Sequence, residues 1–144
     1  DNNAILDAIG GDAKFRIPGL KLLETQGKQN PRVYSYLFTH ESPARRGALG
    51  SCHALDLPFV FGTYFLPGQD KFVGTGPDVE KLSRNMMDAW VAFAKTGNPA
   101  HEGIGAWEPY ETATRKTMIF GKDTGQVQAP FEEERAVWFE IIGE

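Results

Sequence analysis

An apolar and aromatic run at Val33–Phe38 constrains the fold of this chain more than any other feature. The run follows the turn signal Gln29-Asn30-Pro31 and contains a single small polar residue, Ser35. A strand with one solvent-exposed face would alternate apolar and polar side chains, whereas this pattern is typical of a strand buried on both faces. We therefore predict an interior strand of a parallel or mixed sheet, and an α/β fold class.

Residues 77–96 carry the clearest helix signal. Pro77 suits a first helical turn, Asp78 and Glu80 lie near the positive end of the helix dipole, and Gly97 follows as a stop. One apolar face recurs at steps of three and four residues, formed by Val79, Leu82, Met86, Trp90 and Phe93. This spacing predicts a long helix packed on the sheet.

The remaining segments predict shorter elements. The opening residues 1–30 favour helix, with a break at Gly10-Gly11, a cap at Asp12 and a kink or restart at Pro18. Strand patterns follow the long helix, and a terminal helix begins after Pro130; the strand candidates are Trp107–Tyr110, Thr117–Phe120 and Gln126–Gln128. Glu132–Glu134 are expected to form a solvated helix N-terminus.

Composition excludes several classes of protein. The 144 residues suit one domain, and the net charge of −4 comes from both signs scattered along the chain, without the dense basic tract that nucleic-acid binding needs. No apolar run reaches the roughly 18 residues that a membrane span requires. The single cysteine, Cys52, excludes an intrachain disulfide, and the chain begins at Asp1 without a signal-peptide pattern, so the compartment stays open.

No cofactor or metal motif is present. The three histidines, at positions 40, 53 and 101, lack the close spacing of metal-ligand pairs. The glycine-rich fingerprints of nucleotide-binding loops are also absent from the sequence. We therefore predict neither a metal nor a cofactor.

His53 is the strongest candidate for chemistry. It follows the glycine-rich loop 39–52, which leaves the carboxyl end of the predicted strand, where open α/β sheets place functional residues. None of the four serines has glycine two residues before and two after it, as a nucleophile elbow requires. Cys52 is adjacent to His53, and neighbouring side chains of an extended loop point apart. At this point an ordinary loop or capping histidine stays an alternative.

The stretch GALGSCHALDLPFVFG, residues 47–62, resembles the histidine-loop motif of type-B carboxylesterases, the family of the para-nitrobenzyl esterases and cholinesterases. Two later segments are similar to that family in the same order: Trp90–Pro99, which matches the helix after the histidine, and the Trp-x-x-Tyr segment Trp107–Tyr110. The resemblance covers nearly the whole chain.

The resemblance implies the C-terminal segment of an α/β-hydrolase fold, with residues 1–144 as the last portion of a single catalytic domain. The triad order in this superfamily is serine, acid, histidine, so His53 would be its last member. The nucleophile, the acid and the oxyanion hole would then lie upstream of Asp1. The implied reaction is hydrolysis of small uncharged carboxylic esters through an acyl-serine, without cofactor or metal.

The same resemblance assigns roles. His53 would act as general base and then general acid. Leu55 would face the substrate pocket or pack in the core, and Asp56 would orient the loop as a carboxylate behind the histidine, or cap a helix. Cys52 would be a buried or half-buried free thiol. The aromatic residues are expected to pack in the core rather than to line a ligand cage: Phe59, Phe61, Trp90, Phe93 and Trp107.

Two alternatives from other classes stay open. One is a non-catalytic adhesion or scaffold relative that keeps the fold, and the other is a partner-binding fragment without activity of its own. As an isolated chain the segment should expose sheet edges and apolar helix faces. We therefore expect it to associate with the remainder of an esterase domain, or with itself.

Overall fold

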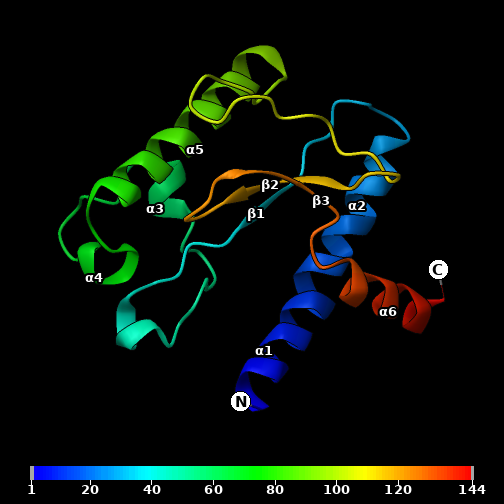
Figure 1. The fold of residues 1–144 in the computed structure, drawn as a ribbon, viewed down its shortest axis with the longest axis horizontal. Coiled ribbons are helices and arrows are strands. Elements are labelled where there is room, and N and C mark those ends of the chain that lie inside the picture. Colours follow the sequence, from blue (N-terminus) through cyan, green and yellow to red (C-terminus); the bar gives the residue numbers. More distant parts are fainter. Residues whose placement is uncertain (1, 144) are drawn as a thin grey trace. The chain divides into compact units, whose positions relative to one another are not determined.

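The computed structural model describes residues 2–143, which form two compact units (Figure 1). Unit 1 comprises residues up to 35 together with 109–116 and 128–143, and unit 2 comprises residues 36–108 and 117–127. The elements in chain order are α1 (Asn2–Gly11), the π-helical η1 (Asp12–Arg16), α2 (Ile17–Gly27), β1 (Tyr36–Phe38), the 3-10 turn η2 (Ala44–Gly47), α3 (Leu57–Val60), α4 (Asp70–Val73), α5 (Pro77–Thr96), β2 (Lys116–Phe120), β3 (Gly125–Gln128) and α6 (Glu132–Ile142).

The sheet has the order β1-β2-β3 (Figure 1). β1 and β2 are parallel, with Tyr36 opposite Met118 and Phe38 opposite Phe120. Residues 121–124 join β2 to β3, and so short a connection requires an antiparallel pair. The predicted mixed sheet is therefore confirmed.

The predicted position of the first strand is wrong for the described chain. β1 covers only Tyr36–Phe38 and lies at an edge of the sheet, and Tyr36 is 39% exposed. The physical reason is that residues 2–143 supply a neighbouring strand on one side of β1 alone. The side of β1 away from β2 therefore has no strand partner among the described residues.

Helix α5 spans Pro77–Thr96, which confirms the predicted helix and its boundaries. It packs on the sheet through Trp90, whose ring centroid lies 5.0 Å from Tyr36 of β1 and 6.0 Å from Phe120 of β2. On the same helix the hydroxyl of Ser83 donates to the carbonyl of Phe59 at 2.9 Å. The fully buried side chains of unit 2 come from the strands, the helices and the loop after His53, among them Leu55, Phe59, Val73, Met86, Met118 and Phe120.

The aromatic side chains divide into two groups. Phe59 and Trp107 are buried and Trp90 is half-buried, as expected for core packing. The same prediction is wrong for Phe61 and Phe93, which are 71% and 47% exposed. Residues 2–143 do not enclose these two rings, although both continue apolar patterns in the sequence.

The strand predicted at Trp107–Tyr110 does not form, whereas β2 and β3 confirm the other two candidates. A side chain takes the place of a strand partner: the amide of Gln126 accepts from the backbone N–H of Glu108 at 3.1 Å and donates to its carbonyl at 2.8 Å. Beyond it, the N–H of Tyr110 donates to the carbonyl of Val33 at 2.7 Å. The backbone groups are thus satisfied without a ladder.

In unit 1 α1 ends at Gly11, at the predicted break, but the backbone stays helical and continues directly into η1. The irregularity appears one residue later as η1, and α2 starts with Pro18 in its first turn, as predicted for a restart. Asp12 does not cap a helix. Its carboxylate instead pairs with Arg16, four residues later, and accepts from the indole N–H of Trp138 at 3.1 Å.

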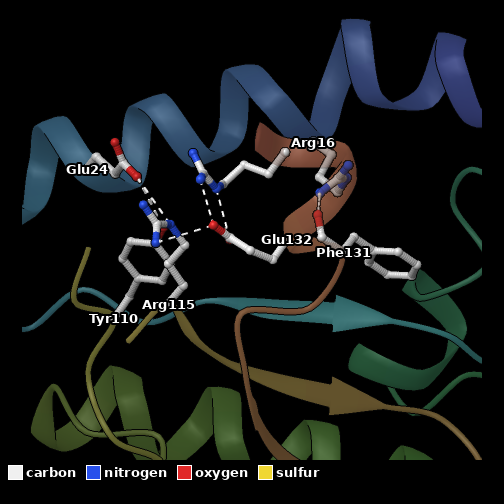
Figure 2. A network of polar contacts seen from close by, with 7 residues as sticks. Arg16, Glu24, Tyr110, Arg115, Phe131 and Glu132 are labelled. Atoms are coloured by element: carbon white, nitrogen blue, oxygen red, sulfur yellow. Dashed lines mark hydrogen bonds and ion pairs between the residues drawn. The ribbon is translucent and has the colours of Figure 1, made fainter. Parts of the chain in front are cut away.

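Unit 1 also contains a network of charged side chains around Glu132 (Figure 2). The Glu132 carboxylate accepts from Arg135 at 2.9 and 2.6 Å and lies 3.7 Å from Arg115. Arg115 is 3.9 Å from Glu24, which also accepts from the Tyr110 hydroxyl at 3.5 Å. The hydrogen bond from Arg135 lowers the pKa of Glu132, and burial raises the pKa of Tyr110 to about 12. The expected solvated N-terminus of α6 therefore holds for Glu133 and Glu134, which are exposed, but not for Glu132.

We predict that Glu132→Gln lowers the free energy of unfolding by about 0.5–1 kcal/mol at neutral pH, because the pair with Arg135 is partly exposed and screened by solvent. A lowered pKa in the folded state stabilises the protein above the ordinary glutamate pKa, and this stabilisation is lost as pH falls. The difference between the two proteins should therefore shrink below about pH 4. Urea denaturation across pH measures it. Glu133→Gln, in the same helical turn, is the control, and equal effects of both substitutions would contradict the prediction.

A second prediction concerns Gly62, which follows α3 with φ +62°. A Cβ at this position would lie 2.4 Å from the sulfur of Met87 on α5. Backbone strain and overpacking together should lower the free energy of unfolding of Gly62→Ala by about 2–4 kcal/mol. Gly68→Ala is the matched control, because Gly68 also has positive φ but has open space around it, so its loss should be about 1–2 kcal/mol. Thermal or urea denaturation of both variants would show whether the contact with Met87 matters.

Candidate active site: the histidine loop

His53 opens the turn of residues 53–56 that leads into α3, and its side chain is exposed. The next residue, Ala54, has φ +63°, a left-handed conformation that is uncommon outside glycine. The chain therefore bends sharply directly after the histidine. Such strained positions in ordered loops are frequent at functional sites.

Hydrogen bonds fix the loop on the side before His53. The Ser51 hydroxyl donates to the carbonyl of Phe38, the last residue of β1, at 2.9 Å. The N–H of Ser42 donates to the carbonyl of Gly50 at 2.9 Å, and its hydroxyl donates to the carbonyl of Phe72 at 2.5 Å. The loop thus returns to the carboxyl end of β1, the place expected for a functional residue of an open α/β sheet.

A buried side chain fixes the loop after His53. Leu55 is fully buried, and its N–H donates to the carbonyl of Cys52 at 3.2 Å. An open depression of about 400 Å³ lies beside it and has an apolar lining with two polar residues, formed by Ala54, Leu57, Pro58, Phe61, Thr63, Gln69 and Phe72. Leu55 is not part of this lining, so the geometry favours packing over the pocket role for it.

Asp56 contacts the sheet. Its carboxylate accepts from the hydroxyl of Tyr36 in β1 at 3.5 Å. Burial of the Tyr36 ring raises the pKa of this tyrosine, and the negative charge of Asp56 raises it further. Asp56 stands at the N-cap of α3, but its side chain makes no capping bond, so the helix-capping alternative is wrong. Cys52 is a half-buried free thiol, as expected.

The other two histidines have structural partners. The Nε2–H of His40 donates to the carbonyl of Val73 at 2.8 Å, since a carbonyl can only accept. His101 accepts from the N–H of Gly103 through Nδ1 and donates from Nε2 to the carbonyl of Asn85 at 3.0 Å. Both rings tie a loop to a neighbouring segment, and both are half-buried, whereas His53 is exposed.

Residues 2–143 contain no group of three or more histidine, cysteine, aspartate or glutamate side chains placed to hold a metal ion. Among the helices of the same residues, none has the length and apolar character needed to cross a membrane.

Residues 1–138 match the family model described as "Carboxylesterase family". The chain belongs to the carboxylesterase family. Among its relatives, the para-nitrobenzyl esterase of Bacillus subtilis is 33% identical over 92% of this chain and 27% of its own length. The acetylcholinesterase of Bungarus fasciatus is 37% identical over 82% of this chain and 19% of its own length.

A crystal structure of a carboxylesterase from Geobacillus stearothermophilus superposes with a TM-score of 0.80 at 34% identity. The match covers 92% of this chain and 27% of that structure. The fold is thus a mixed α/β segment of the carboxylesterase α/β-hydrolase fold. The chain spans about a quarter of the length of the curated relatives that it matches first.

The sequence singled out three loop positions, and the structure shows how they differ. His53 is exposed, Leu55 is buried, and Asp56 faces Tyr36. Sequence reasoning missed Ser51 and Tyr36 as contacts of this carboxylesterase loop. Neither periodicity nor a motif signals them, because both contacts join segments that meet only in the folded chain.

We predict that Leu55→Ala lowers the free energy of unfolding by about 2–5 kcal/mol, since it leaves a cavity under the histidine loop. Leu57→Ala is the control, because Leu57 is 48% exposed and lines the depression; its cost should stay below about 1 kcal/mol. Chemical denaturation of both variants measures the difference. Equally small losses would mean that Leu55 lies in an open pocket instead of the core.

Proposed function

We propose that this chain supplies the catalytic histidine of a serine carboxylic ester hydrolase, and that residues 1–144 are the C-terminal portion of a single catalytic domain. One observation carries the proposal: His53 lies exposed on a bend at the carboxyl end of a sheet strand, in a chain of the carboxylesterase family. His53 is the histidine in the segment that resembles the histidine loop of this family.

The chemistry follows from the imidazole. In the proposed reaction His53 takes the proton of a serine hydroxyl as that oxygen attacks the ester carbonyl, and then gives the proton to the leaving alcohol. A water molecule afterwards attacks the acyl-serine with the same general-base assistance. The serine, the acid that orients the imidazole and the oxyanion hole would come from the remainder of the domain. No metal or cofactor takes part in this scheme.

The surroundings of His53 favour small uncharged esters as substrates. The depression that begins at Ala54 has a mainly apolar lining, and its polar members, Thr63 and Gln69, carry no charge. An apolar lining with a few neutral polar groups suits an acyl or alkoxy group better than an ion. Leu55 would support the histidine loop by packing beneath it, and Asp56 would hold the loop in place.

The remainder of an esterase domain is the proposed partner of this chain. In unit 2, β1 has an uncovered edge, and the large apolar side chains Phe61, Phe65 and Phe93 are exposed. In unit 1, none of the described residues of α1 is buried, and Ile5, Leu6 and Ile9 are exposed. An uncovered strand edge can pair with a further strand, and exposed apolar side chains can pack against a further segment. By itself the chain should be inactive and prone to self-association.

The alternative is a relative that keeps the fold without catalysis. The presence of a serine at the nucleophile-elbow position of the remaining domain would distinguish the enzyme from the non-catalytic relative, since a scaffold protein does not need this serine. Retention of His53, in the segment that resembles the histidine loop of the family, favours the enzyme.

We predict that His53→Ala abolishes hydrolysis of a short-chain nitrophenyl ester by the longer protein that contains this chain, with a loss of about 10³-fold or more in kcat. The loss should occur without a matching loss of stability, because the ring is exposed. Steady-state kinetics measures kcat, thermal denaturation measures stability, and intact mass gives the length of the chain in the active sample.

His101→Ala is the matched control, since it removes a histidine that ties its turn to α5. It should lower stability and leave kcat of the folded fraction near the starting value. Activity that survives His53→Ala, or activity of a pure 15.9 kDa chain, would overturn the proposed function.

A further inference from the structure

Two hydrogen bonds join the histidine loop to a single strand, one on each side of His53. Two residues before the histidine, the Ser51 hydroxyl donates to the carbonyl of Phe38 at 2.9 Å. Three residues after it, Asp56 accepts from the hydroxyl of Tyr36 at 3.5 Å. Both partners belong to β1, at positions separated by one residue. The bend that carries His53 is therefore held at both ends by the same strand.

Tyr36 is a firm support for the second bond. Its backbone lies in the parallel pair with β2, opposite Met118. Its ring meets Trp90 of α5 edge-on at 5.0 Å and Phe120 of β2 at 6.1 Å. Aromatic neighbours on two elements restrict rotation of the ring. The hydroxyl thus has a defined position against Asp56.

We propose that Ser51 and Tyr36 are positioning residues that set the direction of the His53 imidazole. This inference rests on the proposed function, in which His53 must reach the serine oxygen and the leaving-group oxygen in turn. A displacement of about 1 Å in such a site can cost about 10²-fold in rate. Ser51 acts through the backbone before the histidine, and Tyr36 acts through Asp56 after it.

The test uses Ser51→Ala and Tyr36→Phe in the longer protein that contains this chain, with a nitrophenyl ester as substrate. Each variant should lower kcat by about 10-fold and change KM less than about twofold, because the imidazole is misplaced while the ester site stays intact. Ser51→Thr keeps a hydroxyl donor and should restore most of kcat. Adding Asp56→Asn to Tyr36→Phe should cost little more than either change alone, because both remove one shared contact.

Two matched controls remove the same kinds of bond elsewhere. Thr96→Ala removes a hydroxyl that donates to the carbonyl of Ala92 at 2.9 Å, and Tyr110→Phe removes a hydroxyl that donates to Glu24 at 3.5 Å. Their kcat should match the unsubstituted protein. Melting temperatures of all variants identify any loss that comes from unfolding, since a structural defect alone would not be confined to kcat.

The outcomes separate the two proposals. An inactive His53→Ala variant with unchanged kcat in both Ser51→Ala and Tyr36→Phe would overturn this inference and leave the proposed function standing. A rise in KM without a fall in kcat, or failure of Ser51→Thr to restore kcat, would also overturn it. Activity that persists in His53→Ala would overturn the proposed function itself.

Discussion

The parallel pairing of β1 with β2 is the interaction on which the rest of unit 2 depends. It joins residues 36–38 to residues 118–120, which lie far apart in the sequence, and so closes a long loop at a cost in conformational entropy. Once formed, it presents the carboxyl end of β1 to the histidine loop and the rings of Tyr36 and Phe120 to Trp90. The hydrogen bond from Ser51 to Phe38 joins the histidine loop to the last residue of this strand.

Unit 1 is organised by charge more than by burial. None of the described residues of α6 is buried, and its first turn is joined to the chain through Glu132, Arg135 and Arg115. A second polar contact, between Asp12 and Trp138, links η1 to the same helix. Contacts of this kind orient the elements that they join. They add only modestly to the free energy of unfolding when they are partly exposed. The apolar residues Ile5, Leu6 and Ile141 meanwhile remain open to solvent.

Under the proposed function, family membership and partial coverage together account for this uneven burial. The chain matches about a quarter of a solved carboxylesterase with a TM-score of 0.80, so the local architecture is that of the family. A segment of a larger sheet has an edge and faces shaped for neighbours that it does not itself contain. Polar contacts within the segment, such as those of Ser51 and Asp56, do not need those neighbours. The histidine loop can therefore be ordered by contacts among the described residues alone.

The sequence by itself determined the α/β class, the helix Pro77–Thr96 and the two short strands after it, because helix caps, periodicity and turn residues act locally. It also pointed to His53 through the residues around it. Only the tertiary structure decided that Leu55 is buried, that Asp56 faces Tyr36, and that Glu108 bonds to the side chain of Gln126 instead of a strand. These contacts depend on which distant segments meet in the folded chain, and the periodicity of the sequence does not predict them. Phe61 and Phe93 show the same limit, since an apolar pattern predicts that a side chain needs covering but does not identify the segment that covers it.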